Sequence, residues 1–355
     1  MRYVLPVPVW GEFFRELWAS IAAPSYLAPG NISALRRTGI VDILLFTGHE
    51  DSRWLAEHRW VRALAAMANV EFLHIPAAAL APETTENREG MQRKYQIHAE
   101  CIRYALKRYA DDPDAVLLPL TGDVFWTSGY GEAIAAALTG GSHAIASASV
   151  AVDLESVQPV LRALIDRAGP RAFESGAIVK LCLEHLHSKT LAQIWTCGIS
   201  CENFSYFYWS VENGGLVCHA THPVPVAFHL GRIDRKAVEF FGTIDMNFIF
   251  MAVPDTSNIA ILDDSMKGCS LELVRANDQH PKIRHSPWTP EGLGAELANF
   301  RNWGLLFDPA TQSRVALTPV RFRYGPVGDE WTRVEMQSRH LIQATLDRIV
   351  AAPST

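Results

Sequence analysis

The sequence predicts an α/β protein built on a doubly wound sheet, and three observations lead to that prediction. In the first 150 residues, short apolar runs typical of strands alternate with longer segments of helical spacing. Acidic residues follow several of these runs directly, where the carboxyl ends of parallel strands would share one edge. Hydrophobic residues make up 48% of the chain and charged residues 20%, so there is ample material for a large core.

The composition argues against several classes of protein. A net charge of -6 without a long basic run gives little electrostatic basis for binding nucleic acid. No apolar run is long enough for a transmembrane segment, and Pro6 and Pro8 interrupt the N-terminus, which is typical of a strand and not of a signal peptide. Six cysteines in 355 residues do not make a disulfide scaffold, so we expect reduced thiols and a cytoplasmic protein.

The elements of the first half follow from their periodicity and their flanking residues. Apolar runs predict strands at 3–9, 40–47, 70–75, 115–120 and 143–152. Helical spacing predicts helices at 12–22, 55–67, 86–109 and 132–138. In the long helix, one face is expected to carry Met91, Tyr95, Ile102 and Leu106.

The second half is less regular. Helices are predicted at 156–168 and 172–187, an irregular segment at 196–209, and an alternating segment at 216–230. Short apolar segments follow at 243–250 and 259–264, and the tail carries helices at 292–303 and 334–350. No linker stands out, so we expect one catalytic-type domain with a C-terminal elaboration.

The stretch after the central apolar run is the most informative part of the chain. Asp123 comes just past the predicted strand at 115–120, and an aromatic pair and a turn follow it. Ligands of open α/β sheets bind outside the carboxyl ends of the strands, so Asp123 could hold a cation or a sugar hydroxyl. The alternative is that Asp123 only closes a turn, since Gly-Asp is common turn chemistry.

Other acids and histidines are weaker candidates. Asp245 follows a short apolar run, as does the pair Asp263 and Asp264, which repeats the pattern of an acid at a strand end. Lys94, near the start of the long helix, could reach a phosphate as a point charge, or could simply lie on a solvated helix face.

Several familiar motifs are missing from the sequence. There is no G-x-G-x-x-G after the first strand, no phosphate-binding P-loop and no G-x-S-x-G elbow. A zinc site can be written from the following residues, but their spacing matches no common zinc motif: Cys197, Cys201, Cys218, His219 and His222.

The chain resembles bacterial glycosyltransferases of the GT-A fold, a poorly characterised group that uses nucleotide-diphospho-sugars. The resemblance covers most of positions 4 to 273 and rests on a set of short motifs. These are V-P-V-W-G-E, P-S-Y-L-A-P-G-N, the K-Y of the long helix, L-x-G-D-V-F-W-T-S-G, L-E-H-L-H-S-K-T, T-I-D-M-N-F and L-D-D-S. It implies a GT-A-like mixed sheet flanked by helices, with a nucleotide-binding half at 1–152, an acceptor half at 153–273 and a C-terminal extension at 274–355 packed on them.

The resemblance also implies roles for single residues. The donor nucleotide would lie against Val9, Trp10 and Gly11, with Glu50 or Asp51 touching the base. Lys94 would meet the diphosphate, and Asp123 would stand where the last acid of the family's D-x-D signature stands. If transfer inverts the anomeric configuration, the general base would be Asp245 or, as second choice, His222.

This chain departs from the family at the metal. The D-x-D signature holds Mn²⁺ or Mg²⁺ with two carboxylates, but Thr121 stands where the first is expected. We therefore expect weak or no dependence on divalent cations, with Asp123 as the single candidate ligand and basic residues such as Lys94 neutralising the diphosphate.

The prediction is a hexosyltransferase-type enzyme moving a sugar from a nucleotide-diphosphate donor to an unidentified acceptor, which could be a glycan, a lipid-linked molecule or a small molecule. Two alternatives stay open. A sugar nucleotidyltransferase usually carries a Gly-rich basic loop after the first strand, which is absent here. A non-catalytic nucleotide-sugar-binding protein would explain the missing acid at Thr121.

Overall fold

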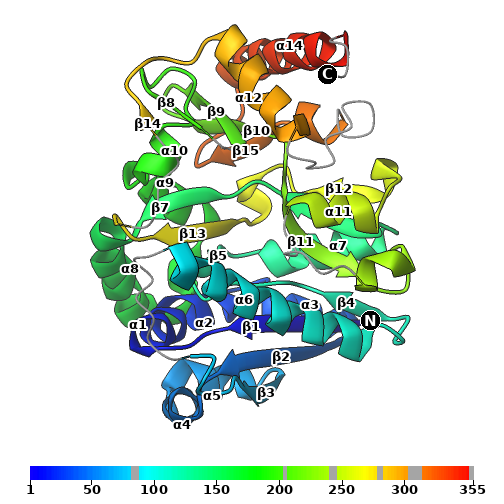
Figure 1. Cartoon of the computed structure of the whole chain (residues 1–355). Coiled ribbons are helices and arrows are strands. Elements are labelled where there is room, and N and C mark those ends of the chain that lie inside the picture. Colours follow the sequence, from blue (N-terminus) through cyan, green and yellow to red (C-terminus); the bar gives the residue numbers. More distant parts are fainter. Residues whose placement is uncertain (81–87, 203–205, 240–245, 278–282, 303–313, 352–355) are drawn as a thin grey trace.

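The computed structural model describes the chain except residues 81–87, 203–205, 240–245, 278–282, 303–313 and 352–355. Within these limits the protein is a mixed α/β structure whose largest element is a seven-stranded sheet flanked by helices (Figure 1). The sheet occupies the lower part of the view, and the C-terminal elements lie at the top.

The sheet has the order β3-β2-β1-β4-β11-β6-β12. Its strands are β1 (Arg2–Pro8), β2 (Ile40–Thr47), β3 (Asn69–His74), β4 (Ala115–Leu117), β6 (Ala144–Ser147), β11 (Val224–His229) and β12 (Ile259–Ile261). All pairings are parallel except those of β11, which runs antiparallel to both β4 and β6. The sheet is therefore mixed, with one reversed strand.

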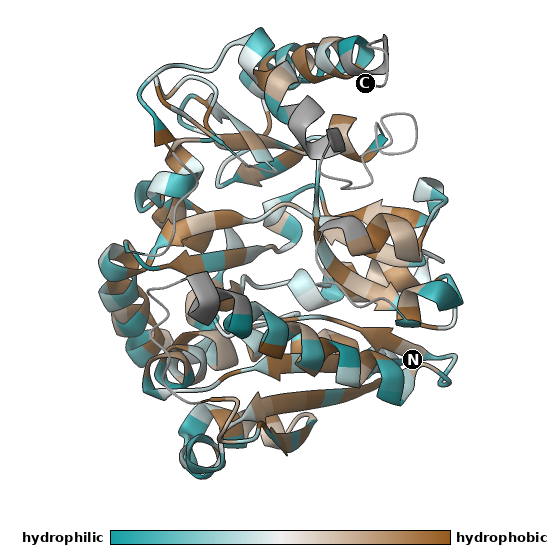
Figure 2. Ribbon diagram, viewed as in Figure 1, coloured by the Kyte–Doolittle hydropathy of each residue, from teal (hydrophilic) through white to brown (hydrophobic). Residues whose placement is uncertain are grey.

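Both faces of the sheet are buried, which explains why its strands are continuous apolar runs in the sequence. Along β1, Tyr3, Leu5 and Val7 face one core and Val4 faces the other. The first core also holds α1 (Glu12–Leu17), the π-helix η1 (Trp18–Ala22), α2 (Ala23–Tyr26), α3 (Ile32–Thr38), α7 (Tyr130–Thr139) and α8 (Leu154–Ala168). The second holds α6 (Arg88–Tyr109) and α11 (Met246–Ala252). Figure 2 shows mostly hydrophobic strands between helices whose outer turns are hydrophilic.

The long helix α6 ends at Tyr109 as predicted and is described from Arg88, but its buried face is rotated from the predicted one. Ile102 and Leu106 are buried as expected, together with Cys101 and Ala105. Tyr95 was predicted on this face but is 53% exposed. The prediction for Tyr95 was wrong because the spacing of apolar residues does not by itself specify the rotation of the helix about its axis relative to the sheet.

Three predicted elements are divided in the structure. The segment 143–152 forms β6 and then β7 (Val150–Asp153), which leaves the large sheet and pairs with β13 (Ser270–Val274). The segment 216–230 forms β10 (Gly215–Ala220) and β11, which belong to different sheets. The predicted helix at 55–67 is two helices, α4 (His49–Glu57) and α5 (Arg59–Ala65), separated by His58 in an extended conformation.

The segment 243–250 also differs from its prediction. The sequence suggested a short strand with an acid at its end, but residues from Met246 onward form helix α11. The Phe248 and Ile249 side chains are fully buried against the sheet, so the apolar run is a buried helical turn.

Residues from both sides of position 273 build the upper part of the molecule. Strand β15 (Val320–Arg323) pairs with β10, and β10 pairs with β9 (Tyr206–Val211). This sheet shares a third core with α12 (Pro290–Asn302) and α14 (Asp329–Ala351), which includes Trp209, Trp288 and Trp331. The C-terminal helices are present as predicted, while β15 was not predicted.

Smaller elements complete the connections. Strand β5 (Val124–Trp126) joins β13 and β7 in a three-stranded sheet, and β8 (Ser200–Cys201) pairs with β14 (Ile283–Arg284). Helices α9 (Ser175–Glu184) and α10 (Ser188–Leu191) follow α8 in the chain. Four short turns of 3₁₀ helix lie at Gly169–Phe173, Arg235–Glu239, Thr256–Asn258 and Ser265–Lys267. Across the described ranges, none of the helices combines the length and the apolar character needed to cross a membrane.

Candidate functional site

The predicted site residues gather at the carboxyl edge of the large sheet. Val9 to Gly11 follow β1, Glu50 and Asp51 lie in the first turn of the helix that follows β2, and Asp123 follows β4 by a short loop. Strand β11 is reversed, so the residues before it reach the same edge: Val224 pairs with Ser147, the last residue of β6. His222 therefore stands at this edge although it precedes a strand.

The loops after β1 and β2 are joined by a carboxylate. The N–H of Gly11 donates to Asp51 at 2.8 Å, and the Arg15 guanidinium donates to the other Asp51 oxygen at 2.8 Å. Gly11 has a φ of 78°, a conformation that glycine adopts without strain. Asp51 thus holds the β1 loop in place, whereas Glu50 is exposed at the surface.

The loop after β4 packs against the loop after β1. A Cβ atom added at Gly122 would lie 3.3 Å from a Val9 methyl carbon and 3.4 Å from the Pro8 carbonyl oxygen. Val9 is buried and Trp10 is partly buried against the second core. Asp123, the next residue after this contact, is half-buried, and its carbonyl oxygen accepts a hydrogen bond from the N–H of Leu273.

A histidine from α6 lies near Asp123, and a lysine on the same helix face lies near that histidine. Lys94 and His98 stand one helical turn apart and therefore share a face of the helix. The pKa of His98 is lowered, chiefly by burial. The negative charge of Asp123 raises this pKa and the positive charge of Lys94 lowers it, so each of these two charged groups lies near the His98 imidazole. The Nε2 atom of His98 is buried and has no hydrogen-bond partner among the described residues.

His98 was missed in the sequence. The only available signal was its position four residues after Lys94, which puts the two side chains on one helix face. Lys94 itself lies with its ammonium 4.8 Å from the centre of the Phe14 ring, so it is not simply a solvated surface residue.

His222 is fully buried, and burial lowers its pKa to about 4. Its Nδ1 atom lies 3.3 Å from the Thr221 hydroxyl. The imidazole is therefore neutral at pH 7. Because a general base works best with a pKa near the working pH, this imidazole would be a weak one.

The remaining acidic residues differ in the hydrogen bonds and ion pairs that they form. Asp264 is 9% exposed and accepts two hydrogen bonds from Arg323, at 2.9 and 2.8 Å. Asp263 is partly exposed and lies 3.6 Å from the Lys267 ammonium. Asp245 lies outside the described residues.

The described surroundings of Asp123 differ from the D-x-D pattern that the resemblance implies for a divalent cation. Mn²⁺ and Mg²⁺ prefer several oxygen ligands, but the residue of α6 that lies near the Asp123 charge is a histidine. Across the described ranges, no three His, Cys, Asp or Glu side chains come together as a metal site would require. All six cysteines are free thiols, and only Cys197 among them is exposed.

Comparison with known proteins yields little. No family model matches the chain, and no curated protein matches it. Among solved structures, a crystal structure of mouse xyloside xylosyltransferase 1 in its apo form is similar over 47% of this chain and 59% of that one, with 12% sequence identity and a TM-score of 0.28. The chain thus spans about three-fifths of that protein's length, and a similarity this low assigns neither fold nor activity.

Proposed function

We propose that this protein is a GT-A-type glycosyltransferase that moves a sugar from a nucleotide-diphospho-sugar to an acceptor. The proposal rests on one observation above all. The loops after β1, β2 and β4 contact one another at the carboxyl edge of the sheet, through the Gly11–Asp51 hydrogen bond and the packing of Gly122 on Val9. Sheets of this kind bind their ligands at that edge.

The donor half of the site would use the residues that meet there. The nucleotide would lie against Val9, Trp10 and Gly11, with Glu50 as the exposed acid nearest the base. The Lys94 ammonium would stabilise the negative charge that develops on the diphosphate as it leaves. Asp123 would orient the donor sugar through its hydroxyl groups. No step of the transfer is assigned to a metal.

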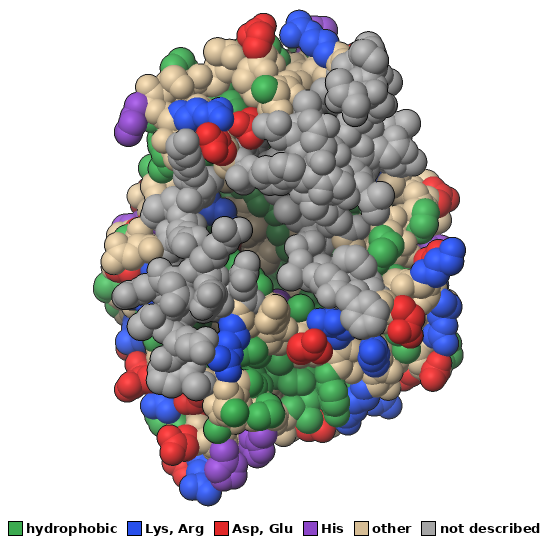
Figure 3. All heavy atoms as spheres, in the orientation of Figure 1, with side chains coloured by type: hydrophobic (Ala, Val, Ile, Leu, Met, Phe, Trp, Pro, Cys, Tyr) green, Lys and Arg blue, Asp and Glu red, His purple; other side chains and the backbone are tan. Residues whose placement is uncertain are grey.

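The acceptor would enter from the hollow that Figure 3 shows near the middle of this face of the molecule. A general base is needed there if the reaction inverts the anomeric configuration. Asp245 is the first choice for that role. His222 is the second, because its pKa of about 4 makes it a weak base at neutral pH.

The cellular setting belongs to the same proposal. Five of the six free thiols are buried and burial raises the pKa of each, which suits a reducing compartment such as the cytoplasm.

Calorimetric titration with UDP-, GDP- and dTDP-linked sugars tests the proposal. We expect one nucleotide-sugar to bind and a Lys94→Met variant to bind it at least about tenfold more weakly, the scale of one charge-assisted contact. Slow hydrolysis or transfer of the bound sugar would distinguish an enzyme from a non-catalytic binding protein. Formation of a nucleotide-sugar from a nucleoside triphosphate and a sugar phosphate would favour the nucleotidyltransferase. Binding of none of these donors would reject the function proposed here.

A further inference from the structure

Two adjacent aromatic rings at the start of α1 each carry a cation that comes from another part of the chain. The Phe13 and Phe14 ring centres lie 5.0 Å apart, with their planes at 82°. The ammonium nitrogen of Lys94 lies 4.8 Å from the centre of the Phe14 ring. The guanidinium carbon of Arg275 lies 4.8 Å from the centre of the Phe13 ring. Both rings follow closely on the β1 loop assigned above to the donor, so both cations lie close to that loop.

Arg275 reaches this position from beyond residue 273, where the resemblance to a known family ends. It directly follows strand β13, and the N–H of Leu273 donates to the carbonyl oxygen of Asp123 at 2.9 Å. On its other side, the N–H of Ala276 donates to the Glu155 carboxylate at 3.0 Å. These two hydrogen bonds hold the backbone on both sides of Arg275, which therefore stands beside both the Asp123 loop and the start of α1.

No acid neutralises either cation in the part of the chain that the structure describes. No ion pair and no side-chain hydrogen bond there involves Lys94 or Arg275. The Glu155 carboxylate accepts from the backbone next to Arg275 and, within this part, forms no ion pair with the guanidinium. The face of an aromatic ring attracts a cation through its quadrupole, but it carries no net charge that would cancel the charge of the cation. Both positive charges are therefore available to an anion.

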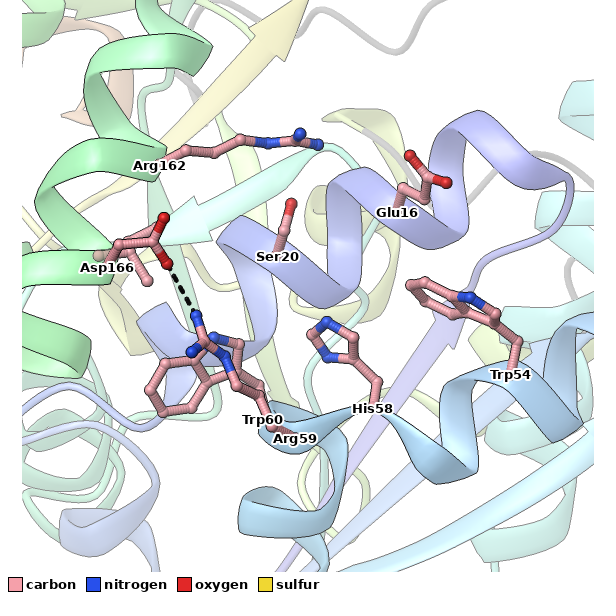
Figure 4. A pocket seen from close by; sticks show the side chains of 9 residues that line it. Glu16, Ser20, Trp54, His58, Arg59, Trp60, Arg162 and Asp166 are labelled. Carbon is pink, nitrogen blue, oxygen red and sulfur yellow. Dashed lines mark hydrogen bonds and ion pairs between the residues drawn. The ribbon is translucent and has the colours of Figure 1, made fainter.

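An arginine elsewhere in the protein shows the contrast. The Arg59 guanidinium lies 4.8 Å from the centre of the Trp60 ring, the same distance as that of Arg275 from its ring. Arg59 is also paired with the Asp166 carboxylate at 2.9 Å, as Figure 4 shows. An acid thus neutralises the ring-bound arginine between α5 and α8, whereas the two ring-bound cations at the start of α1 have no such partner among the described residues.

Two cations without an acid partner favour an anion that has two separate negative groups. A diphosphate is such an anion, because each of its phosphoryl groups carries negative charge and can meet one cation. The planar guanidinium of Arg275 can donate two parallel hydrogen bonds to phosphate oxygens, and the Lys94 ammonium acts as a point charge. Because the cations lie on separate rings, an anion with one phosphoryl group for each suits them better than a single phosphate.

We propose that Arg275 and Lys94 together bind the diphosphate of the nucleotide-sugar donor, with one phosphoryl group for each cation. This assignment rests on the function proposed above, and it adds to the donor site a residue from outside the predicted glycosyltransferase domain. The two cations would supply at the diphosphate the positive charge that the D-x-D signature obtains from a metal ion.

The test is calorimetric titration of the whole chain in EDTA with inorganic pyrophosphate and, separately, with orthophosphate. We expect pyrophosphate to bind more tightly than orthophosphate. Arg275→Gln and Lys94→Met should each weaken pyrophosphate binding by at least about tenfold, the scale of one charge-assisted contact. Arg275→Lys should weaken it less, because this substitution keeps the charge and loses only the planar fork.

The matched control is Arg59→Gln. Arg59 is exposed, as Arg275 is, and lies at the same distance from an aromatic ring, but it belongs to none of the loops assigned to the donor. Its substitution should leave pyrophosphate binding unchanged. Because both arginines are exposed, we expect Arg275→Gln and Arg59→Gln to melt at nearly the temperature of the unmodified protein.

Three results would overturn the proposal: pyrophosphate does not bind, Arg275→Gln binds it as tightly as the unmodified protein does, or Arg59→Gln weakens binding as much as Arg275→Gln. Nucleotide-sugar titrations of the same variants keep this proposal apart from the proposed function. A nucleotide-sugar that binds equally to the unmodified protein and to Arg275→Gln would reject the role of Arg275 and leave the transferase function in place. Pyrophosphate binding that depends on Arg275, without binding of any nucleotide-sugar, would reject the transferase and leave the anion site in place.

Discussion

The guanidinium of Arg323 donates two hydrogen bonds to the carboxylate of Asp264, Nε to Oδ1 at 2.9 Å and Nη2 to Oδ2 at 2.8 Å. Both side chains are largely buried, at 18% and 9% exposure. The pair connects the turn after β12 to strand β15, which belongs to the C-terminal segment. Asp264, which follows an apolar run in the sequence as Asp123 does, therefore already has both carboxylate oxygens engaged.

The first prediction concerns the contribution of this pair to stability. Asp264→Asn should lower the free energy of unfolding by about 2–3 kcal/mol, the scale of hydrogen bonds between charged groups. Arg333→Gln is the control, because the Arg333–Glu330 pair is exposed on α14 and exposed ion pairs contribute little to stability. Urea unfolding measures both, and equal effects of the two substitutions would contradict the prediction.

The pH dependence of this difference follows from the pKa of Asp264. Burial alone would raise that pKa, but the Arg323 hydrogen bonds, the Met266 N–H and the charges of Arg323 and Lys267 bring it below its ordinary value. The folded state thus holds its proton less tightly than the unfolded state. The stabilisation is complete above the unfolded pKa of about 3.9 and is lost as the pH falls from there through the folded pKa. The difference in the free energy of unfolding between the unmodified protein and the Asp264→Asn variant should therefore become smaller at acidic pH.

The second prediction concerns the donor site. Asp123→Asn keeps the shape of the side chain and removes the charge near His98. Sugar transfer should fall by at least about a hundredfold, the scale of losing a key polar contact in a transition state. The melting temperature should change little, because the residue is half-buried at a strand end. Near-normal turnover in this variant would show that the active site lies elsewhere.

The third prediction concerns divalent cations. If Thr121 stands where the D-x-D signature would have its first carboxylate, as the resemblance implies, chelation should leave donor binding and sugar transfer nearly unchanged. The measurement compares activity in EDTA with activity after Mn²⁺ is added back. Activity that disappears in EDTA and returns with Mn²⁺ would mean that another acid completes a metal site, and Asp263 would then be the first to test.

The fourth prediction concerns Asp245. If its carboxylate accepts the proton of the attacking hydroxyl, Asp245→Asn should strongly suppress transfer and leave donor affinity nearly unchanged, because binding and proton removal are separate tasks. If Asp245 only caps a turn, the Asp245→Asn variant should be less stable, and the protein that still folds should keep its activity. The two cases are separated by measuring the melting temperature, the donor affinity and the turnover of this one variant. A loss of donor affinity at full stability would mean that Asp245 contacts the nucleotide donor and not the acceptor.

The sequence by itself determined the first three strands of the large sheet and helices α6 and α7 to within about two residues, and it singled out the acids at the strand ends. These are local signals. Strands buried on both faces are unbroken apolar runs, and acids that follow them stand out against that background.

Only the tertiary structure decided which strand pairs with which and which side chains are engaged. Two residues after β6, strand β7 leaves the large sheet because its backbone finds its partner in β13, more than a hundred positions along the chain. Asp51 and Asp264 both look like free acids in the sequence, but Gly11, Arg15 and Arg323 engage them in the structure. His98, by contrast, has no motif in the sequence and becomes a site residue only where α6 crosses the loop that carries Asp123. Strand pairing and ion pairing join residues far apart in sequence, so no window of the chain contains both partners.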